Sequence, residues 1–378
     1  MLTINKLFRF SASHRCYNPV WTDARNLEAF GKEATGKFGH GHNFGAAFVL
    51  TGPVDSKTGM IMEFSQIKYK INMAIIDKYD HKFINEVEPF DKTVPTQENI
   101  SAHFLQEASE LFHKEPAQVV ACHIISSPER SATSYQDRDT ESHWQEDLFL
   151  SGNLGYLISE GVDLGAVLYP FKLLVTLNVG KDLFLEHSYQ KTLKDLLRQV
   201  TAKKIGDSID SGLGLISKYC YDLFKKHLPV VRIKLSFADM FAEYFGSGET
   251  VFGREDYFYA MHKLGNGFSE EEKTRYYGKC RFLHGHSFRV ETSIKQGLGN
   301  IKAEAEAVKG LKNVMSGLVQ DWDHKYLEQE TADFKNRIST GEEIVQVLRT
   351  KILKSLPADL YRLRLWETEN NRFCWREA

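Results

Sequence analysis

Internal repetition constrains this sequence most, because a repeated segment is expected to fold into the same unit each time it occurs. Near the start, RFSASHRC (9–16) precedes GKFGHGHNFGAAFVL (36–50). Near the end, YFYAMHKLG (257–265) precedes GKCRFLHGHSFRVET (278–292). Each pair predicts a strand that carries one histidine, a loop, and a second strand that begins with His-Gly-His. The chain is therefore expected to contain at least two copies of one unit.

The segments that follow each pair also occur in the same order. A helical pattern with Asp-His near its end is followed by a turn that opens a second helix, an apolar strand and a short final strand. The matching segments are 65–83 and 301–327, 95–112 and 339–353, 118–127 and 361–368, and 131–136 and 372–375. Both units are therefore predicted to have the order ββααββ.

The middle of the chain resembles the two ends more weakly. Residues 232–245 align without a gap on residues 362–375, and residues 183–200 resemble residues 60–75. We interpret this part as a third, degenerate copy that lacks His-Gly-His and Asp-His; the alternative is a linker domain with a similar order of elements. The predicted domains are residues 1–140, 141–247 and 248–378.

The overall composition excludes several classes of protein. A chain of 378 residues is too long for one ordinary hydrophobic core, which agrees with several units. The 48 basic and 50 acidic side chains balance closely, so neither a nucleic-acid partner nor a membrane-surface partner is expected. No apolar run is long enough to cross a membrane, and no secretory signal is recognised. Five scattered cysteines fit a reducing cytoplasm better than a disulfide framework.

The histidines of the repeated pairs predict two metal sites. Side chains two residues apart on a strand point to the same face, so both histidines of each His-Gly-His can bind one ion. A histidine on the neighbouring strand supplies a third nitrogen, and three nitrogens with an open fourth position are typical of catalytic zinc. Histidines without a metal are the alternative, which the repetition disfavours. The two sets are His14, His40 and His42, and His262, His284 and His286.

Candidate acid–base groups lie close to these histidines in the sequence. Cys280 comes four residues before His284, and a thiol beside a dication loses its proton more easily; it could instead be a fourth ligand or a buried thiol. An aspartate beside a histidine can orient it and raise its basicity, as in Asp-His at residues 80–81 and 323–324. Glu367 ends an apolar strand, where its carboxylate could accept paired hydrogen bonds or lie on a solvated rim.

Together these motifs resemble the 6-pyruvoyl-tetrahydropterin synthase and 6-carboxy-tetrahydropterin synthase family. The first unit contributes FSASH, GHGHNF, GMIMEFSQIK, YDHKFIN and PTQEN. The last unit contributes AMHKL, CRFLHGHSF, DHKYL, STGEE and LWETENN. The resemblance covers about the first 135 and the last 130 residues.

The resemblance implies an α+β tunnelling fold, in which ββααββ units pair edge to edge into an antiparallel barrel with helices on the outside. It also implies a zinc-dependent lyase whose substrate is 7,8-dihydroneopterin triphosphate. Three histidines hold the zinc ion, which polarises the side-chain hydroxyls, and a cysteine assisted by an Asp-His pair of an adjacent unit removes a proton. A glutamate anchors the pterin, and triphosphate leaves without hydrolysis.

Carried over residue by residue, the resemblance makes the last unit complete. The ligands match His262, His284 and His286, the base matches Cys280, the anchor matches Glu367, and the assisting pair matches Asp323 and His324. Thr340 and Glu342 match the substrate-binding turn, where Ser339 replaces proline. The C-x-x-x-HGH spacing is similar to that of the bacterial carboxy-forming branch. The last unit lacks the GMxMEF element of the first.

The first unit departs further from the family pattern. It keeps the metal histidines, the pair Asp80 and His81, and the turn residues Thr96 and Glu98. Its segment WTDARNLEAFGKE resembles the animal pyruvoyl synthases, but Glu33 stands where cysteine is expected, and Ser126 matches the anchor. Some family members use glutamate instead of the cysteine, so Glu33 is a candidate base. Without the anchor, we expect a metal site that is weakly active or inactive.

Family members build barrels from three units, so one chain is expected to form one pseudo-threefold barrel and two chains a homodimer of stacked barrels. The site at Cys280 is then predicted to receive Asp80 and His81 from the first unit. The product would be 6-pyruvoyl-tetrahydropterin, for tetrahydrobiopterin synthesis, or 6-carboxy-tetrahydropterin, for deazaguanine (queuosine) synthesis. The alternatives are a catalytically inactive pterin- or purine-binding module and, on the three-histidine site alone, a metal hydrolase.

Overall fold

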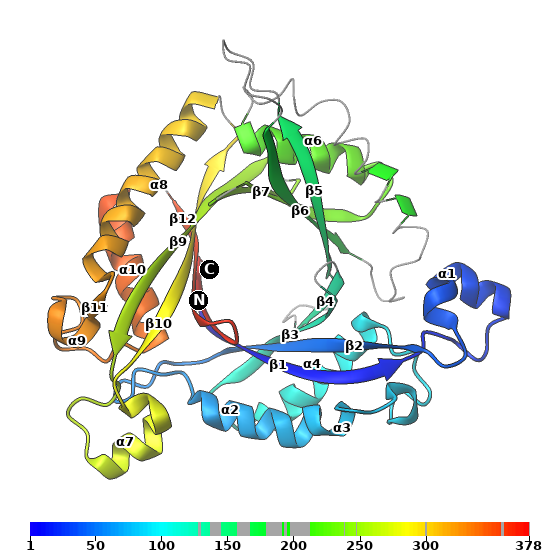
Figure 1. The fold of residues 1–378 in the computed structure, drawn as a ribbon, viewed down its shortest axis with the longest axis horizontal. Coiled ribbons are helices and arrows are strands. Elements are labelled where there is room, and N and C mark those ends of the chain that lie inside the picture. The colour runs from blue at the N-terminus through cyan, green and yellow to red at the C-terminus, as the bar shows by residue number, and fades with distance from the viewer. Residues whose placement is uncertain are drawn as a thin grey trace.

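The computed structural model describes residues 1–127, 130–136, 145–156, 167–178, 191–192, 195–196, 212–237, 239–246, 248–298, 301–356 and 359–377. These residues form a ring of strands with helices around its outside (Figure 1). None of the described helices is long and apolar enough to cross a membrane.

The two ends of the chain fold into units with the same element order. The first unit contains β1 (Leu2–His14), α1 (Asp23–Thr35), β2 (His40–Thr51), α2 (Phe64–Ile71), the π-helix η1 (Asn72–Ile76), α3 (Asp77–Tyr79), the 3₁₀ helix η2 (Ile84–Glu86), α4 (Gln97–Phe112), β3 (Gln118–Ser127) and β4 (Arg130–Tyr135). The last unit contains β9 (Glu249–His262), α7 (Glu270–Tyr277), the 3₁₀ helix η4 (Gly278–Arg281), β10 (His284–Gly297), α8 (Ile301–Trp322), β11 (Lys325–Tyr326), α9 (Leu327–Glu330), α10 (Gly341–Ser355), β12 (Leu360–Thr368) and β13 (Asn371–Arg376).

The middle of the chain supplies further strands and one described long helix. They are β5 (Gln145–Tyr156), β6 (Val167–Asn178), α6 (Gly212–Lys225), β7 (Val230–Phe237) and β8 (Met240–Tyr244). Most of the helix expected at residues 183–200 lies outside the described residues. The expected domain boundaries at residues 140 and 247 fall between elements, and the division into three units stays a prediction.

The strands close into one ring. The order is β9-β10-β12-β13-β1-β2-β3-β4-β5-β6-β7-β8, and β8 pairs with β9 to complete it. Every pair in the ring is antiparallel, whereas β11 adds to β9 in parallel. The closure through β13 and β1 places Leu2 opposite Trp375. The α+β tunnelling fold expected from the sequence is confirmed.

The core lies between the outer face of the ring and the helices. Along β1, Ile4, Phe8 and Phe10 are buried with alternating spacing, as expected for a strand with one face under helices. The same hydrophobic cluster continues through the last unit, where it includes Phe288 and Trp322, while a second cluster is formed by β6, α6 and β7. Burial of this outer face supplies the main driving force for the fold.

Two helices occur where the sequence predicted loops. α1 and α7 each lie between the histidine strand and the His-Gly-His strand of their unit. Thr22 caps α1 by accepting a hydrogen bond from Arg25 N, and Ser269 caps α7 in a capping box with Glu272. Both segments are so rich in polar residues that hydrophobic periodicity did not predict a helix in either of them. Their C-terminal ends lead towards the metal-site strands.

Candidate active site

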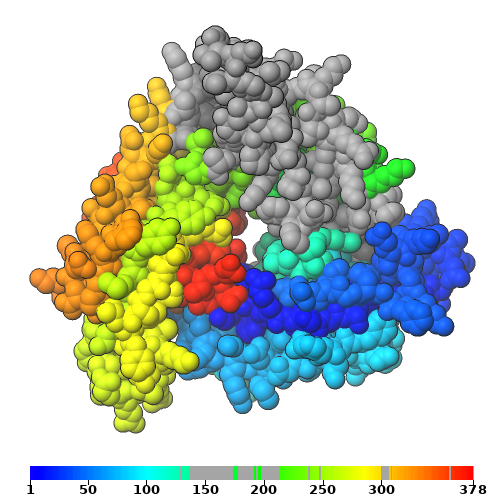
Figure 2. All heavy atoms as spheres, in the orientation of Figure 1, coloured from blue at the N-terminus to red at the C-terminus, as the bar shows by residue number. Residues whose placement is uncertain are grey.

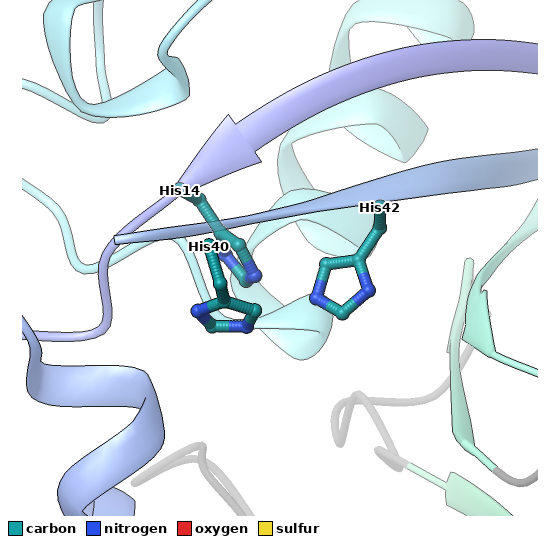
Figure 3. A group of neighbouring side chains, drawn as sticks. All are labelled: His14, His40 and His42. Carbon is teal, nitrogen blue, oxygen red and sulfur yellow. The ribbon is translucent and has the colours of Figure 1, made fainter. Parts of the chain in front are cut away.

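The six histidines form two clusters with the same geometry. His14 lies opposite His40 across β1 and β2, and His262 lies opposite His284 across β9 and β10. In each cluster, one nitrogen from each of the three rings lies within 4.8 Å of the others. Figure 3 shows the first cluster, in which the rings from two neighbouring strands converge. The sequence prediction that each set comes together is therefore correct.

Hydrogen bonds orient the central histidine of each cluster. His14 Nδ1 lies 2.7 Å from Pro95 O, and His262 Nδ1 lies 3.0 Å from Ser339 O. A ring that donates from Nδ1 to a carbonyl leaves Nε2 free to bind a metal. His14 Nε2 and His286 Nε2 are buried and have no hydrogen-bond partner in the described structure. These nitrogens are the atoms that a metal ion would satisfy.

The protonation state of the most buried ring suits metal binding in both clusters. Burial lowers the pKa of His14 to about 3 and the pKa of His262 to about 4, so both rings are neutral at pH 7. Metal ligation requires the neutral imidazole. Three histidine nitrogens from two neighbouring strands, as each cluster offers, fit the open coordination of catalytic zinc.

Zinc content should report the two clusters separately. We expect two zinc ions per chain, one for each cluster, and one ion after either His40→Ala/His42→Ala or His284→Ala/His286→Ala. Elemental analysis after dialysis against a weak chelator measures this, and each double variant is the matched control for the other. A wild-type chain that retains only one ion would contradict it.

The last cluster lies beside the candidate base and anchor. Glu367 Oε1 lies 3.9 Å from His262 Nε2 and 3.8 Å from His286 Nε2. Asn371 Nδ2 donates to Glu367 Oε2 at 3.2 Å and fixes the carboxylate. Burial raises the pKa of the Cys280 thiol, and the charges of Glu367 and Glu63 raise it further. A positive charge at the histidine cluster is therefore needed to make this thiol a usable base.

Part of this site comes from the first unit. Tyr277 OH donates to Thr58 O at 3.0 Å, and Thr340 Oγ1 donates to Gly59 O at 2.7 Å. Ile61 N donates to Glu342 Oε1 at 3.1 Å. Figure 2 shows the last unit, in yellow to red, against the first unit, in blue. The GMxMEF element, which the last unit lacks, is thus supplied across the junction by the first unit.

This junction adds residues that the sequence did not single out. Glu63 follows residues 58–61, the segment of the first unit that contacts the last unit. Its carboxylate lies 3.9 Å from the position that a Cβ on Gly278 would occupy. A signal was present, because GMIMEF occurs in the first unit and is missing from the last. Thr340 also caps α10, so the roles of Thr340 and Glu342 in substrate binding stay predictions.

Glu342 should make the stability of this junction depend on pH. Burial raises the pKa of Glu342 from its ordinary value of 4.5 to about 8. The folded protein therefore binds more protons than the unfolded chain between these values, and its stability falls as pH rises through this window. Compared with Glu342→Gln, we expect the free energy of unfolding to fall by up to about 1.4 kcal/mol per pH unit between about pH 5 and pH 8.

Urea unfolding of both proteins at several pH values, with the metal content held constant, measures this difference. The glutamine side chain keeps an acceptor for Ile61 N, so the hydrogen bond across the junction is conserved in the control. Parallel stability curves for the two proteins would show that Glu342 does not titrate in this window.

The turn of the first unit has the same local structure. Thr96 caps α4 by accepting a hydrogen bond from Asn99 N, and Glu98 is fully buried. Glu33 lies on α1. Burial and the charge of Arg130 lower the pKa of His40, and the negative charge of Glu33 partly opposes this lowering. The structure therefore brings Glu33 near its metal cluster, and its role as a base stays a prediction.

The two Asp-His pairs are built alike and lie on strand edges. Asp80 accepts from Ser11 N at 2.9 Å and lies 3.0 Å from His81 Nδ1. Asp323 accepts from Tyr259 N at 2.8 Å and lies 2.9 Å from His324 Nδ1. Both histidines have a φ of 57° and are largely exposed.

Neither Asp-His pair forms a hydrogen bond or ion pair with Cys280 among the described residues. Asp80 follows α3, which lies at the opposite end of the first unit from α7 (Figure 1). Which pair assists the thiol, and from which chain, stays a prediction.

Comparisons with known proteins relate both ends of the chain to one family. The sequence model of a family described as 6-pyruvoyl tetrahydropterin synthase matches residues 3–137 and 252–378. The 6-pyruvoyl tetrahydrobiopterin synthase of Drosophila melanogaster is 36% identical over 128 residues, which cover 34% of this chain and 74% of that protein. The 6-carboxy-5,6,7,8-tetrahydropterin synthase of Haemophilus influenzae is 25% identical over 118 residues, which cover 26% of this chain and 83% of that protein. The structure of Caenorhabditis elegans 6-pyruvoyl tetrahydropterin synthase aligns with 29% identity and a TM-score of 0.33, covering 36% of this chain and 97% of that chain.

Proposed function

Because this chain belongs to the 6-pyruvoyl tetrahydropterin synthase family, whose members are lyases acting on phosphates, we propose that it converts 7,8-dihydroneopterin triphosphate to a tetrahydropterin. The reaction releases triphosphate and depends on zinc. One observation carries the assignment to the last unit: Cys280, Glu367 and the cluster at His262 lie together at one junction.

Each residue of this junction has a part in the reaction. Zinc held by His262, His284 and His286 would polarise the side-chain hydroxyls of the substrate. Glu367, held by Asn371, accepts paired hydrogen bonds from the amidine-like edge of the pterin and so fixes its orientation. Cys280 then removes a proton from the side chain, and triphosphate leaves from the neighbouring carbon as the double bond forms.

The product is a 6-pyruvoyl- or 6-carboxy-tetrahydropterin. In both cases the dihydropterin ring gains the two hydrogens that the side chain loses, so no outside reductant is needed. The 6-pyruvoyl product keeps all three side-chain carbons, whereas the 6-carboxy product also requires cleavage of a side-chain carbon–carbon bond by water, with release of a two-carbon fragment. The motif of the first unit and the Drosophila relative support the first, which leads to tetrahydrobiopterin. The C-x-x-x-HGH spacing and the Haemophilus relative support the second, which leads to deazaguanines such as queuosine. The five free cysteines support the cytoplasm as the site of this reaction.

A second chain would complete the catalytic group. We propose a homodimer of stacked barrels, in which an exposed Asp-His pair of one barrel reaches Cys280 of the other. In this arrangement Asp80 and His81 of one chain are the pair that assists Cys280 of the other chain, and Asp323 and His324 are the alternative pair. Mixing inactive Cys280→Ala chains with inactive His81→Asn chains should restore activity if the pair acts between barrels, and no restoration would refute this arrangement.

Product analysis tests the proposed function. Zinc-loaded protein is incubated with 7,8-dihydroneopterin triphosphate, and the products are identified by mass. Release of triphosphate with a tetrahydropterin, lost in His284→Ala/His286→Ala and retained in His40→Ala/His42→Ala, is expected. Binding of the pterin without turnover would favour the alternative, an inactive pterin- or purine-binding module, and hydrolysis to free phosphate would favour a metal hydrolase.

A further inference from the structure

The first cluster differs from the last at the position of the anchor. In the first unit Gly45 pairs with Ile125, and in the last unit Arg289 pairs with Trp366. Gly45 and Arg289 each lie three residues after the second histidine of His-Gly-His, so the register makes Ser126 the counterpart of Glu367. In both units the ladder to the next strand is irregular at this residue. The carboxylate of the last site is therefore replaced by a hydroxyl.

The partner of the anchor has changed as well. Ser127 pairs with Arg130, and Thr368 pairs with Asn371, so Arg130 is the counterpart of Asn371. Asn371 donates to the Glu367 carboxylate in the last site. In the first site a guanidinium stands in place of this amide and no carboxylate faces it from the anchor position. The two substitutions together replace the carboxylate and amide of the last site with a hydroxyl and a guanidinium.

Arg130 belongs to the same cavity as the metal histidines. A cavity of about 110 Å³ is lined by His14, His40 and His42 together with Ser126 and Arg130. The charge of Arg130 acts on all three rings, where it helps to lower each pKa. Only 3% of the surface of His14 is exposed, and its buried Nε2 has no hydrogen-bond partner among the described residues. The cavity thus combines a built metal site with a fixed positive charge.

We propose that the first cluster binds a divalent metal ion and, with Arg130, a small oxyanion, meaning a carboxylate or phosphate group, instead of a pterin ring. One anionic oxygen would occupy the open coordination position, and the guanidinium would pair with a second oxygen of the same group. At the anchor position a pterin finds the Ser126 hydroxyl instead of a carboxylate that could accept its amidine-like edge.

Cobalt substitution isolates this site for a test. The full-length His284→Ala/His286→Ala chain keeps only the first cluster, and its bound Co²⁺ has visible bands that respond to a new ligand. Inorganic phosphate, acetate and unphosphorylated 7,8-dihydroneopterin are titrated in turn. We expect saturable changes with phosphate, acetate or both, and none with the pterin. A response to phosphate alone identifies phosphate esters as the ligand class, and a response to acetate identifies carboxylates.

The Arg130→Asn substitution installs the residue of the last unit and should weaken anion binding by at least about tenfold, as expected for a lost charged hydrogen bond. An equal Co²⁺ content in both proteins shows that the cluster remains intact. No response to either anion, an unchanged affinity after Arg130→Asn, or a response to the pterin would overturn the proposal.

Matched variants at the other cluster complete the test. The His40→Ala/His42→Ala chain keeps only the last cluster, which should respond to the pterin and bind the anions at least about tenfold more weakly than the first cluster does. Introducing Glu367→Ser/Asn371→Arg into that chain should give the last cluster the anion response, and failure to do so counts against the proposal. These measurements do not use turnover at Cys280, so their result is independent of the proposed lyase activity.

Discussion

Replacing Cys280 with alanine should lower turnover by about 10²–10⁴-fold, the range expected for loss of a general base. Substrate binding should change little, because the metal histidines and the Glu367–Asn371 pair remain in place. Steady-state kinetics with 7,8-dihydroneopterin triphosphate measures the effect, and zinc content confirms that the site is intact. The pH dependence of the remaining activity should no longer report a thiol.

Two further substitutions make this prediction specific. Cys374→Ala removes a partly buried thiol of the same unit, on β13, and should leave turnover unchanged. Glu33→Ala removes the candidate base of the first unit and should have little effect if the last unit carries the reaction. Loss of activity in Glu33→Ala, with Cys280→Ala still active, would assign catalysis to the first unit instead.

Replacing Arg362 with methionine should destabilise the fold by about 3–5 kcal/mol, because it breaks a buried ion pair and Glu243 stays buried without its nearest cationic partner. Arg362 Nη2 lies 2.6 Å from Glu243 Oε1 and 3.0 Å from Glu291 Oε1, and all three side chains are nearly inaccessible. Lys234 and Arg364 also pair with Glu291, at 2.7 Å and 3.0 Å.

Denaturant unfolding of Arg362→Met measures this loss. The matched control is Arg9→Met, which breaks an exposed pair with Glu369 and should change the unfolding free energy by less than about 1 kcal/mol. A loss for Arg362→Met as small as that of the control would mean that the network rearranges around the substitution. Burial alone would raise the pKa of Glu243, but Arg362, Arg232 and Lys234 lower it to about 2, so the loss should persist at mildly acidic pH.

The network lies on the inner face of the ring. Leu363 and Leu365 alternate with Arg362 and Arg364 along β12, and the two leucines belong to the core under the outer helices. The arginines therefore point to the opposite face, towards the centre of the ring in Figure 1. Sequence alternation alone reveals the two faces of this strand, but it does not show which acidic residues of β8 and β10 meet the arginines.

The histidine clusters could be predicted because their geometry is local. Residues two apart on a strand share a face, and the neighbouring strand is joined to it along the chain, so His262, His284 and His286 had to converge once both strands formed. Repetition then distinguished these histidines from others in the sequence. The ββααββ order of the units also followed from the repetition, whereas the fold class followed from the family resemblance that these motifs carry.

The junction could not be predicted in this way. Thr58 and Tyr277 are in contact across 219 positions in the sequence, and no periodicity relates them. The absence of GMxMEF from the last unit was visible, but only the closed ring shows that the first unit supplies it. The correspondence of Arg130 with Asn371 was hidden for a similar reason, since it depends on a strand register that is irregular at the preceding residues.

The closure of β13 onto β1 has an evolutionary consequence. In a ring assembled from identical separate chains, one substitution changes every junction at once, and a site cannot be altered without altering its copies. Here a single chain completes the ring, so a codon change affects one junction alone. Selection can therefore preserve the residues of one junction while those of another change, and Glu367 and Asn371 of the last unit do align with Ser126 and Arg130 of the first.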